Sequence, residues 1–351
     1  MSIDPERISE ISSTGSLQFA NDLAIWNPGE KGGSIRWFAH LQHRRGNGGF
    51  DAYINPDWAL FRAEDVVPRA TSRTLKGATS ETWLAFDLPT GWSSVTPYSG
   101  RDHRYRIDNL QRRFDLPSGW MILGRVGVRF DTIAGTLAKV AAPEGQGARR
   151  MDMLAMLHWT LPEAKRVLPE FPDRLTIVSA GAPMWRGGLS GPMSLFIHAD
   201  RPLLSENATS TLLHEVFHVG FAPSAIPGAD WIIEGLAEFY SLQILVRSGT
   251  ISNARFNAAL ASLEKWGRDT SDICVRRSSG SVTARAVSIF AKLDAEIRAA
   301  TSNRHSLDDV TRTLAIDDMK ISIDTLRRSV ADVMGKNSDT LAAANLPGCD
   351  E

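Results

Sequence analysis

The sequence predicts an α+β protein in which a β-rich N-terminal part precedes a mainly helical part, and two observations lead to this class. Residues 1 to about 145 contain short apolar segments separated by Gly, Pro and Asn turns, at the spacing typical of a β-sandwich. From about residue 230 onward the chain reads as mostly helical. A length of 351 residues is enough for two domains with their own cores. We therefore expect an N-terminal domain at 1–145, a second domain at 146–340 and a tail at 341–351.

Strands in the N-terminal part are predicted at two short apolar segments, Ser34–Ala39 and Thr82–Phe86. A small internal repeat follows the second of them. The heptapeptide FDLPTGW at Phe86–Trp92 returns as FDLPSGW at Phe114–Trp120. In each copy Pro and Gly predict a turn, and Trp begins the next segment. We interpret the pair as two equivalent strand–turn units rather than as a functional repeat.

The second part begins after a Pro- and Gly-containing linker predicted at Ala142–Gly147. A helix is expected at Arg149–Leu168, and strands are expected at Arg174–Ser179 and Met193–His198. This order gives a small sheet before the helical region, which supports the α+β class.

The most informative motif is H-E-x-x-H, which begins at His214 within an apolar run that Ser205 or Asn207 can cap as a helix. At a spacing of four, His214 and His218 lie on one helix face, so both imidazoles can bind one metal ion. Glu215 is then placed to deprotonate a water molecule at that metal. The weaker alternative is a pair of hydrogen-bonded core histidines.

A third metal ligand is predicted on the next helix, which Asp230 can cap and Gly249 can end. Glu234 is our candidate because a catalytic zinc site of the two-histidine type needs a carboxylate from a second helix. Glu238, one turn later, could accept the second ring N–H of a zinc histidine and fix its tautomer. The alternative is that both carboxylates form the solvated face of an amphipathic helix.

The bulk composition excludes few classes of protein. The formal net charge of −1 gives no electrostatic reason to expect a nucleic acid or an anionic membrane as partner. No apolar run approaches the roughly 18 residues that a membrane helix needs. The first 15 residues are polar and acidic, so we expect a soluble chain without a signal peptide as given. It would be cytoplasmic, or periplasmic if an upstream leader is missing.

The chain contains two cysteines, Cys274 and Cys349. They do not have the spacing of a zinc ribbon. Two unrelated thiols and a disulfide that ties the C-terminal tail to the second domain are equally compatible with the sequence. A disulfide would require an oxidising compartment.

HEVFH followed by WIIEGLAEFY at Trp231–Tyr240 resembles the gluzincin metallopeptidases, whose third ligand lies in a W-x-x-E-G-x-x-[DE]-[FY] segment. Within them the chain most resembles the M61 glycyl-aminopeptidase family, which is related to the M1 aminopeptidases. Phe86–Trp92 resembles the F-x-L-P-x-G-W turn of that family, and Arg186–Leu189 resembles its G-G-L segment. Leu293–Arg298 and Ser306–Asp309 resemble its late helix and S-L-D-D turn.

This resemblance implies a thermolysin-like catalytic domain and one Zn²⁺ per chain. It implies a peptide or protein substrate whose backbone adds to a sheet edge as an extra strand, and it leaves the oligomeric state open. The residues of that edge strand are then Gly187, Gly188, Leu189 and Ser190.

Two positions depart from the family pattern. The aminopeptidases carry a glutamate that binds the free α-amine of the substrate, and Ser190 stands in its place. Their late helix begins near a tyrosine that hydrogen-bonds the tetrahedral intermediate, whereas this chain has Thr283 or Ala284 there. Tyr240 is the last tyrosine in the sequence.

Arg285 and His305 could replace the missing tyrosine as donors to the oxyanion. The alternative for each is a solvated helix or turn residue. The sequence therefore supports two hypotheses. The favoured one is a zinc metallopeptidase for which the sequence does not decide between exopeptidase and endopeptidase specificity. Manganese or cobalt could take the place of zinc as the native metal. The other is a catalytically weak zinc protein that recognises peptides or serves as a scaffold.

Overall fold

The computed structural model describes residues 1–351 except 47, 109–115, 316–319 and 350–351. The chain forms two compact units. Unit 1 comprises Met1–Asp131, Leu137–Leu154 and Arg174–Arg201, and unit 2 comprises Thr132–Thr136, Ala155–Asp173 and Pro202–Glu351. Chain segments therefore alternate between the units, and the single domain boundary expected at residue 145 stays a prediction.

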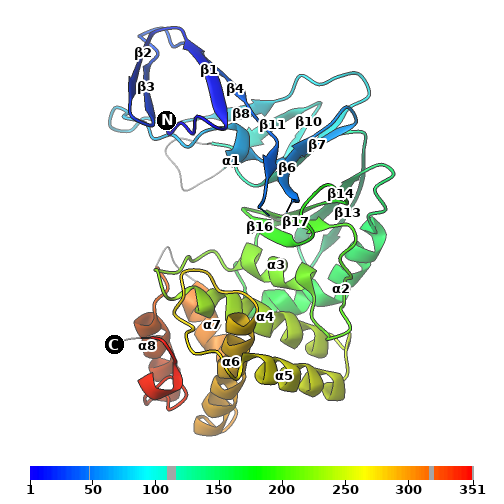
Figure 1. The fold of residues 1–351 in the computed structure, drawn as a ribbon, viewed down its shortest axis with the longest axis vertical. Helices are drawn as coiled ribbons and strands as arrows, with labels where there is room; N and C mark the ends of the chain where they lie inside the picture. Colours follow the sequence, from blue (N-terminus) through cyan, green and yellow to red (C-terminus); the bar gives the residue numbers. More distant parts are fainter. Residues whose placement is uncertain (47, 109–115, 316–319, 350–351) are drawn as a thin grey trace. The chain divides into compact units, whose positions relative to one another are not determined.

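Unit 1 begins with antiparallel strands (Figure 1). They form two separate pairs, β1–β4 and β2–β3, a three-stranded sheet in the order β10-β11-β8, and a five-stranded sheet in the order β5-β6-β7-β12-β9. The strands are β1 (Ile8–Ser13), β2 (Ser16–Ala20), β3 (Leu23–Asn27), β4 (Ile35–Ala39), β5 (His43–Arg44), β6 (Phe50–Ile54), β7 (Trp58–Arg62), β8 (Thr82–Ala85), β9 (Ser93–Val95), β10 (Gly100–Arg101), β11 (Arg104–Ile107) and β12 (Trp120–Gly124).

A mixed five-stranded sheet follows, in the order β13-β14-β15-β17-β16. β15 runs parallel to both β14 and β17, whereas β16 pairs antiparallel with β17 and forms an edge. The strands are β13 (Val126–Ile133), β14 (Thr136–Pro143), β15 (Arg174–Ala180), β16 (Gly188–Gly191) and β17 (Ser194–His198). A buried core in unit 1 joins β12 to β17, with the rings of Trp120 and Phe196 5.3 Å apart.

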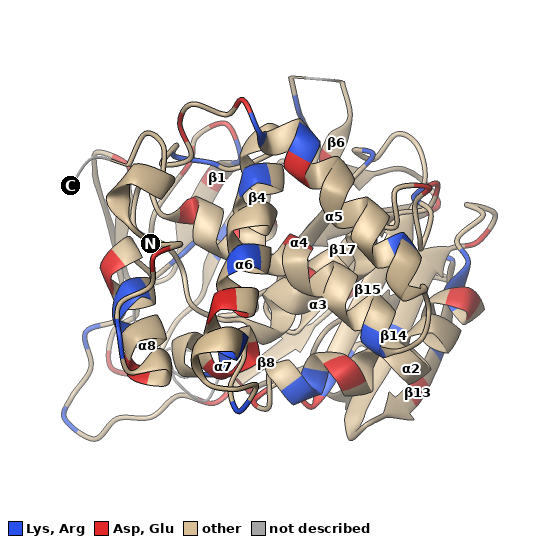
Figure 2. Ribbon diagram, turned by 90° about the horizontal axis from the view of Figure 1, so that it is seen from below, with Lys and Arg blue, Asp and Glu red and all other residues tan. Residues whose placement is uncertain are grey.

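The described helices lie mainly in unit 2, where α6 packs against both α4 and α5. Figure 2 shows both acidic and basic residues on α6 and on α8. The helices are α1 (Ala63–Val66) in unit 1, α2 (Arg150–Val167), α3 (Thr211–Gly220), α4 (Asp230–Arg247), α5 (Asn253–Gly267), α6 (Ser281–Ala300), α7 (Leu307–Ala315) and α8 (Ile323–Met334). Among the described residues, none of the helices has both the length and the apolar character that a bilayer span requires.

The structure confirms the α+β class and the element order expected from the sequence. The strands predicted at Ser34–Ala39 and Thr82–Phe86 are β4 and β8, and the predicted helix Arg149–Leu168 is α2. The strands predicted at Arg174–Ser179 and Met193–His198 are β15 and β17.

The first FDLPxGW copy forms the expected turn. The backbone N–H of Trp92 donates to the carbonyl of Pro89 at 3.0 Å, and Gly91 has a φ of +83° that favours glycine. In the second copy Gly119 has a φ of +85° and Trp120 begins β12. Phe114 and the residue after it lie outside the described residues.

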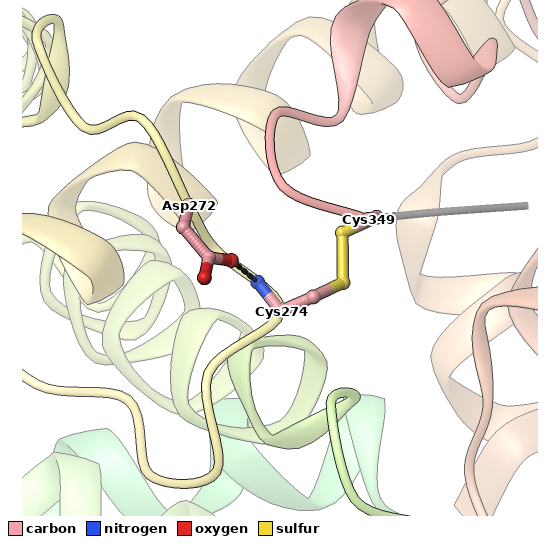
Figure 3. The surroundings of a disulfide bond; sticks show 3 residues. All are labelled: Asp272, Cys274 and Cys349. Atoms are coloured by element: carbon pink, nitrogen blue, oxygen red, sulfur yellow. Dashed lines mark hydrogen bonds between the residues drawn. A yellow bond between two sulfur atoms is a disulfide. The ribbon is translucent and has the colours of Figure 1, made fainter.

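The two cysteines form a disulfide, which decides the alternative that the sequence left open. Cys274 and Cys349 are joined with their Cα atoms 5.2 Å apart (Figure 3). Beside the bridge, the backbone N–H of Ile273 donates to the carbonyl of Pro347 at 2.9 Å. The C-terminal segment is therefore tied to the loop that precedes α6.

Candidate metal centre

The helix that carries the HExxH motif is α3. Ser210 caps it, because its side chain accepts a hydrogen bond from the backbone N–H of Leu213 at 3.3 Å. The cap expected at Ser205 or Asn207 is wrong: the hydroxyl of Ser205 instead accepts from the backbone N–H of Thr209 at 3.0 Å, in the turn before the helix. The apolar residues of α3 are buried in unit 2: Leu212, Leu213, Val216, Phe217 and Val219.

The helix that carries the predicted third ligand is α4. Its N-cap is Ala229, and Asp230 is its first residue. The expected capping role of Asp230 is therefore wrong, because its carboxylate accepts from the backbone N–H of Ser278 at 2.6 Å. The end is as predicted: α4 stops at Arg247, and Gly249 follows with a φ of +72°.

Close packing fixes α4 between α3 and α6. A Cβ on Gly235 would lie 2.5 Å from the Cβ of Ala286, so only glycine allows α6 to approach this closely. On the other side, the rings of Phe217 on α3 and Tyr240 on α4 stack with centroids 5.3 Å apart. Gly235 directly follows Glu234, so this packing fixes the part of α4 that carries the predicted third ligand.

The three predicted ligands converge. The Nε2 atoms of His214 and His218 lie 3.1 Å apart. The carboxylate of Glu234 has one oxygen 3.3 Å from His214 Nε2 and the other 3.5 Å from His218 Nε2. One ligand atom from each residue lies within 4.8 Å of the others, and all three side chains are half-buried.

These distances fit a zinc ion. Ligand atoms that surround zinc tetrahedrally at about 2.0–2.1 Å are about 3.3–3.4 Å from one another. The 3.1 Å between the two Nε2 atoms is close to that edge length, and the carboxylate of Glu234 offers a different oxygen to each histidine, at 3.3 and 3.5 Å. Two histidines and one glutamate are also the donor set of catalytic zinc sites that keep one position open.

Glu238 supports the first histidine. Its carboxylate lies 3.0 Å from Nδ1 of His214, the ring nitrogen that faces away from Glu234. A carboxylate that accepts the second ring N–H of a ligand histidine fixes the tautomer and raises its basicity. The geometry is the one that the sequence predicts for Glu238.

The electrostatics of the group favour a cation. Burial lowers the pKa of His214, but hydrogen bonds with Glu234 and Glu238 outweigh burial and hold the pKa well above its ordinary value. Burial and the charge on His214 lower the pKa of His218 to about 4. Burial raises the pKa of Glu234, but the hydrogen bond with His214 outweighs it and lowers that pKa.

Glu215 lies next to His214 on α3 and is 7% exposed. Its negative charge acts on His214 and raises the pKa of that imidazole. The chain therefore keeps a buried carboxylate beside the ligand group, in the sequence position that HExxH predicts for the base.

The residues predicted to bind the substrate lie in unit 1, on the edge strand β16 or directly before it. Gly187 precedes the strand and lies against the ring of Trp185, so a side chain there would overlap the indole. Leu189 and Ser190 pair with Phe196 and Leu195 of β17. Their role in binding stays a prediction, as does that of Gly188.

The residues considered as oxyanion donors lie at opposite ends of α6. Arg285 is in its first turns, and its Nε is buried without a hydrogen-bond partner among the described residues. His305 follows the helix, is 48% exposed and lies 3.5 Å from Asp309. Since Ala286 packs on Gly235, the end of α6 is about 20 Å further along the axis at 1.5 Å per residue. This placement favours Arg285, although both roles stay predictions.

Sequence reasoning missed a polar network that joins α4 to α7. Arg247 binds both carboxylate oxygens of Asp308, at 2.8 and 3.0 Å. The buried hydroxyl of Tyr240 donates to Asp308 at 3.1 Å and lies 3.0 Å from the hydroxyl of Thr311. Burial and the charge of Asp308 raise the pKa of Tyr240 well above its ordinary value. The only hint of this network in the sequence was the Ser306–Asp309 segment. Its Asp308 binds Arg247 and so ties α7 to α4, the helix that carries Glu234.

The sequence matches no protein-family model and no curated protein. The fold does have similar solved structures. An aminopeptidase N family protein from Idiomarina loihiensis has a TM-score of 0.65 at 15% identity, covering 98% of this chain and 66% of that one. A two-domain M1 zinc metallopeptidase variant bound to L-arginine has a TM-score of 0.59 at 14% identity, with 97% and 84% covered. An M1 zinc metallopeptidase variant from Deinococcus radiodurans, bound to Tyr-Ser-Ala, has a TM-score of 0.58 at 15% identity, with 97% and 84% covered.

The chain therefore has the fold of the M1 zinc metallopeptidases over nearly its whole length, while it spans 66% of the length of the Idiomarina protein. Within that fold it retains a His–His–Glu group of zinc-ligand type.

Proposed function

We propose that this protein is a zinc-dependent metallopeptidase that hydrolyses peptide bonds. The observation that carries the proposal is the convergence of His214, His218 and Glu234 within 4.8 Å on an M1-type fold. The solvated-face interpretation of Glu234 does not explain this convergence, because a carboxylate on such a face has no reason to meet two histidines of another helix. We propose one zinc ion per chain at this group.

A bound zinc ion supplies Lewis-acid polarisation of the scissile carbonyl and a water of near-neutral pKa. In our proposal Glu215 takes a proton from the attacking water and later gives it to the leaving amine. Its burial beside His214 supports this role, since a carboxylate held in a fixed position loses little freedom when it accepts the proton. Glu238 holds the His214 ring, through Nδ1, in the orientation that ligation needs.

The proposed substrate is a peptide that lies along β16 as an added strand. β16 is an edge strand of the mixed sheet, and edge strands present backbone groups that can pair with an extended peptide. A fold relative was solved with the peptide Tyr-Ser-Ala, which supports a peptide as ligand class. Within the gluzincins we place the chain near the M61 glycyl-aminopeptidases, on the F-x-L-P-x-G-W, G-G-L and S-L-D-D segments.

Arg285 is our proposed donor to the oxyanion in place of the missing tyrosine. It lies next to Ala286, which packs on the residue after Glu234, and its buried Nε has no other partner among the described residues. Buried donors without a partner are rare in folded proteins and call for an explanation. A developing negative charge on the substrate provides one.

The disulfide supports an oxidising compartment for the protein, because such bonds rarely persist in reducing cytosol. We therefore favour a periplasmic or secreted location over a cytoplasmic one.

A second candidate function is a zinc protein that binds peptides with weak or no turnover. Two observations favour it: the late helix carries no tyrosine, and Ser190 replaces the amine-binding glutamate. The two candidates differ in what they require of Glu215, since a binding protein has no use for a general base.

The test is hydrolysis of a mixed peptide pool by the zinc-loaded protein, with and without a chelator. Glu215→Gln should keep zinc and lose about 10²–10⁴-fold in rate, because the amide cannot accept the proton. Glu264→Gln, an exposed carboxylate on α5, is the matched control and should retain activity. Chelator-sensitive cleavage that disappears in Glu215→Gln supports a peptidase. Zinc binding without any cleavage by the wild type would instead support the second candidate, a zinc protein that binds peptides without turnover.

A further inference from the structure

The disulfide lies beside a cavity that borders the start of α4. Cys274 and Cys349 are both half-exposed, and both line this cavity, whose volume is about 290 Å³. Another part of the lining is Ile226–Ala229, the segment that runs directly into α4. The start of α8 supplies the remaining part. The bridge is therefore open to small reagents and lies next to the chain that leads to Glu234.

The 268–280 loop, which carries Cys274 and precedes α6, packs against the segment before α4. Gly228 has a φ of +85°, and a Cβ there would lie 3.3 Å from the carbonyl oxygen of Cys274. Two residues later, the carboxylate of Asp230 accepts a hydrogen bond from the backbone N–H of Ser278 at 2.6 Å. The loop that holds one half of the disulfide thus also holds the first residue of α4.

The start of α4 depends on these contacts because the helix has no side-chain cap of its own. Its N-cap is Ala229, and an alanine side chain cannot accept a hydrogen bond from the first N–H groups of a helix. The other end of α4 is fixed separately, by Arg247 on Asp308. Glu234 lies about one turn after Asp230. A movement of the loop would therefore act on the turn of α4 that carries the third ligand.

The disulfide holds this loop against the C-terminal segment that follows α8. Beside the bridge, the backbone N–H of Ile273 donates to the carbonyl of Pro347 at 2.9 Å. Gly348 lies so close to the loop that a Cβ would be 2.6 Å from the Cα of Asp272. Such a backbone hydrogen bond contributes little by itself, because water competes for both partners. Once the bridge is broken, we expect the loop to move more freely.

We propose that the disulfide regulates the metal centre: the oxidised protein binds zinc tightly, and reduction of the bridge weakens zinc binding through the 268–280 loop and the first turn of α4. The inference rests on the proposed function, because it concerns the zinc site assigned there. It gives that site a dependence on its surroundings. A peptidase made in a reducing compartment would reach its full zinc affinity only after it enters an oxidising one.

The redox step needs only a small thiol as reductant. Its thiolate attacks one sulfur of the bridge, the S–S bond breaks, and the other cysteine leaves as a thiolate that takes up a proton. A second thiol attacks the mixed disulfide and releases the first cysteine. Two reductant thiols are thereby oxidised to one disulfide, and the two cysteines gain the two electrons and two protons that these thiols lose.

The zinc affinity of the full-length protein is the first measurement. In buffers of defined free zinc, the oxidised wild type is compared with the double variant Cys274→Ser and Cys349→Ser. We expect binding to weaken by about 5- to 50-fold, within the usual range of coupling between two sites. The metal should not be lost altogether, because the packing of Gly235 on Ala286 does not need the bridge. Equal affinities in two folded proteins would overturn the proposal.

Thermodynamic linkage supplies a second readout, which a purely structural bridge would not move. If oxidation tightens zinc binding by some factor, zinc must shift the thiol–disulfide equilibrium toward the disulfide by the same factor. Glutathione redox buffers at fixed free zinc, followed by alkylation and mass spectrometry, measure this equilibrium. His214→Ala is the control, because it removes a ligand and should abolish the shift. An equilibrium that does not respond to zinc, or that responds equally in His214→Ala, would overturn the proposal.

Asp230 tests the route between the bridge and the metal. Asp230→Ala removes the acceptor for Ser278 but keeps the disulfide, so zinc affinity should fall in the oxidised protein and should respond less to reduction. Asp230→Asn keeps an acceptor oxygen and should behave more like the wild type. The control is Asp324→Asn, which changes an 82% exposed carboxylate beside the same cavity and should keep the full redox response. A redox response that Asp230→Ala leaves unchanged would contradict the route through α4.

The outcomes for regulation and for catalysis are distinguishable. If the wild type hydrolyses peptides while zinc affinity ignores the redox state, the regulation fails and the proposed function stands. If zinc affinity follows the redox state while the wild type cleaves nothing, the proposed peptidase activity fails and a regulated metal centre remains. Near-ultraviolet circular dichroism of the double cysteine variant shows whether it is folded. If it is not, the Asp230 variants carry the test in protein that keeps its disulfide.

Discussion

The two helices that carry the candidate metal ligands differ from the edge strand β16 in how many of the side chains that the gluzincin pattern predicts they present. On α3 and α4, His214, His218, Glu234 and Glu238 all occupy positions at which they can act together. On β16, Ser190 stands where the aminopeptidase pattern predicts a carboxylate. Metal binding needs several side chains in one geometry, whereas a single substrate contact can be supplied by another element. The candidate metal centre therefore depends on several residues acting together, whereas a contact with the substrate depends on single residues.

Replacing Arg285 should have the largest effect among the predictions that follow from this difference. If its guanidinium stabilises the oxyanion, Arg285→Ala should reduce kcat by about 10²–10³-fold, or about 3–4 kcal/mol, with zinc content unchanged. The measurement is steady-state hydrolysis beside Arg268→Ala, an exposed arginine at the end of α5. A kcat equal to that of the control would mean that Arg285 does not donate a hydrogen bond to the oxyanion.

Removing the disulfide should have the next largest effect. The bridge closes a sequence separation of 75 residues in unit 2, so Cys349→Ser combined with Cys274→Ser should cost about 2–4 kcal/mol. For a domain of this size we expect a melting temperature lower by about 5–10 °C. The same decrease should appear when a dithiol reduces the wild type, and the double variant should not respond to the dithiol. Equal melting temperatures in all cases would show that the tail contributes little.

Changing Glu238 tests whether the metal region acts as a group. Glu238→Gln weakens the acceptor for Nδ1 of His214, so the affinity for zinc should fall by about 10- to 100-fold. Competition with a zinc chelator of known affinity measures this. Unchanged affinity would mean that the 3.0 Å contact does not orient the ligand.

Acid should act most weakly, through Glu296 on α6. Burial raises the pKa of this carboxyl, but hydrogen bonds from Ser338, Asp339 and Thr340 outweigh burial and lower it. A lowered carboxyl pKa stabilises the fold above the unfolded value of 4.5, and that contribution disappears as the pH falls through the lower folded value. Because the group is half-exposed, we expect a shift of about 1–3 °C, with the wild type losing its advantage over Glu296→Gln below about pH 4. Melting curves from pH 3 to 6 test this.

The comparison also explains what could be predicted from the sequence. His214 and His218 are four residues apart on one helix, so their common face follows from local geometry alone. Glu234 could be predicted because a catalytic zinc site with two histidines needs a third ligand, a carboxylate, from a second helix. One prediction failed because a distant segment competed: Asp230 does not cap α4 because the backbone N–H of Ser278, 48 residues later, donates to its carboxylate. Local patterns cannot show such partners.

The cavity that Glu64 and Ser190 line together in unit 1 was outside the reach of the sequence for the same reason. Glu64 lies 126 positions before Ser190, and its carboxylate accepts a hydrogen bond from the backbone N–H of Gly119. The polar network of Tyr240, Arg247 and Asp308 likewise joins residues about 60–70 positions apart. Long-range polar partners are set by tertiary packing and become visible only in the structure.

The metal content of the purified protein tests the central claim most directly. Elemental analysis of the wild type after reconstitution should give about one zinc per chain. His214→Ala and Glu234→Ala should each lose the metal, because each removes one of the three ligands, while Glu264→Ala should retain it. A wild type without zinc, or a Glu234→Ala variant that binds zinc as tightly as the wild type, would contradict a metal centre shared by α3 and α4.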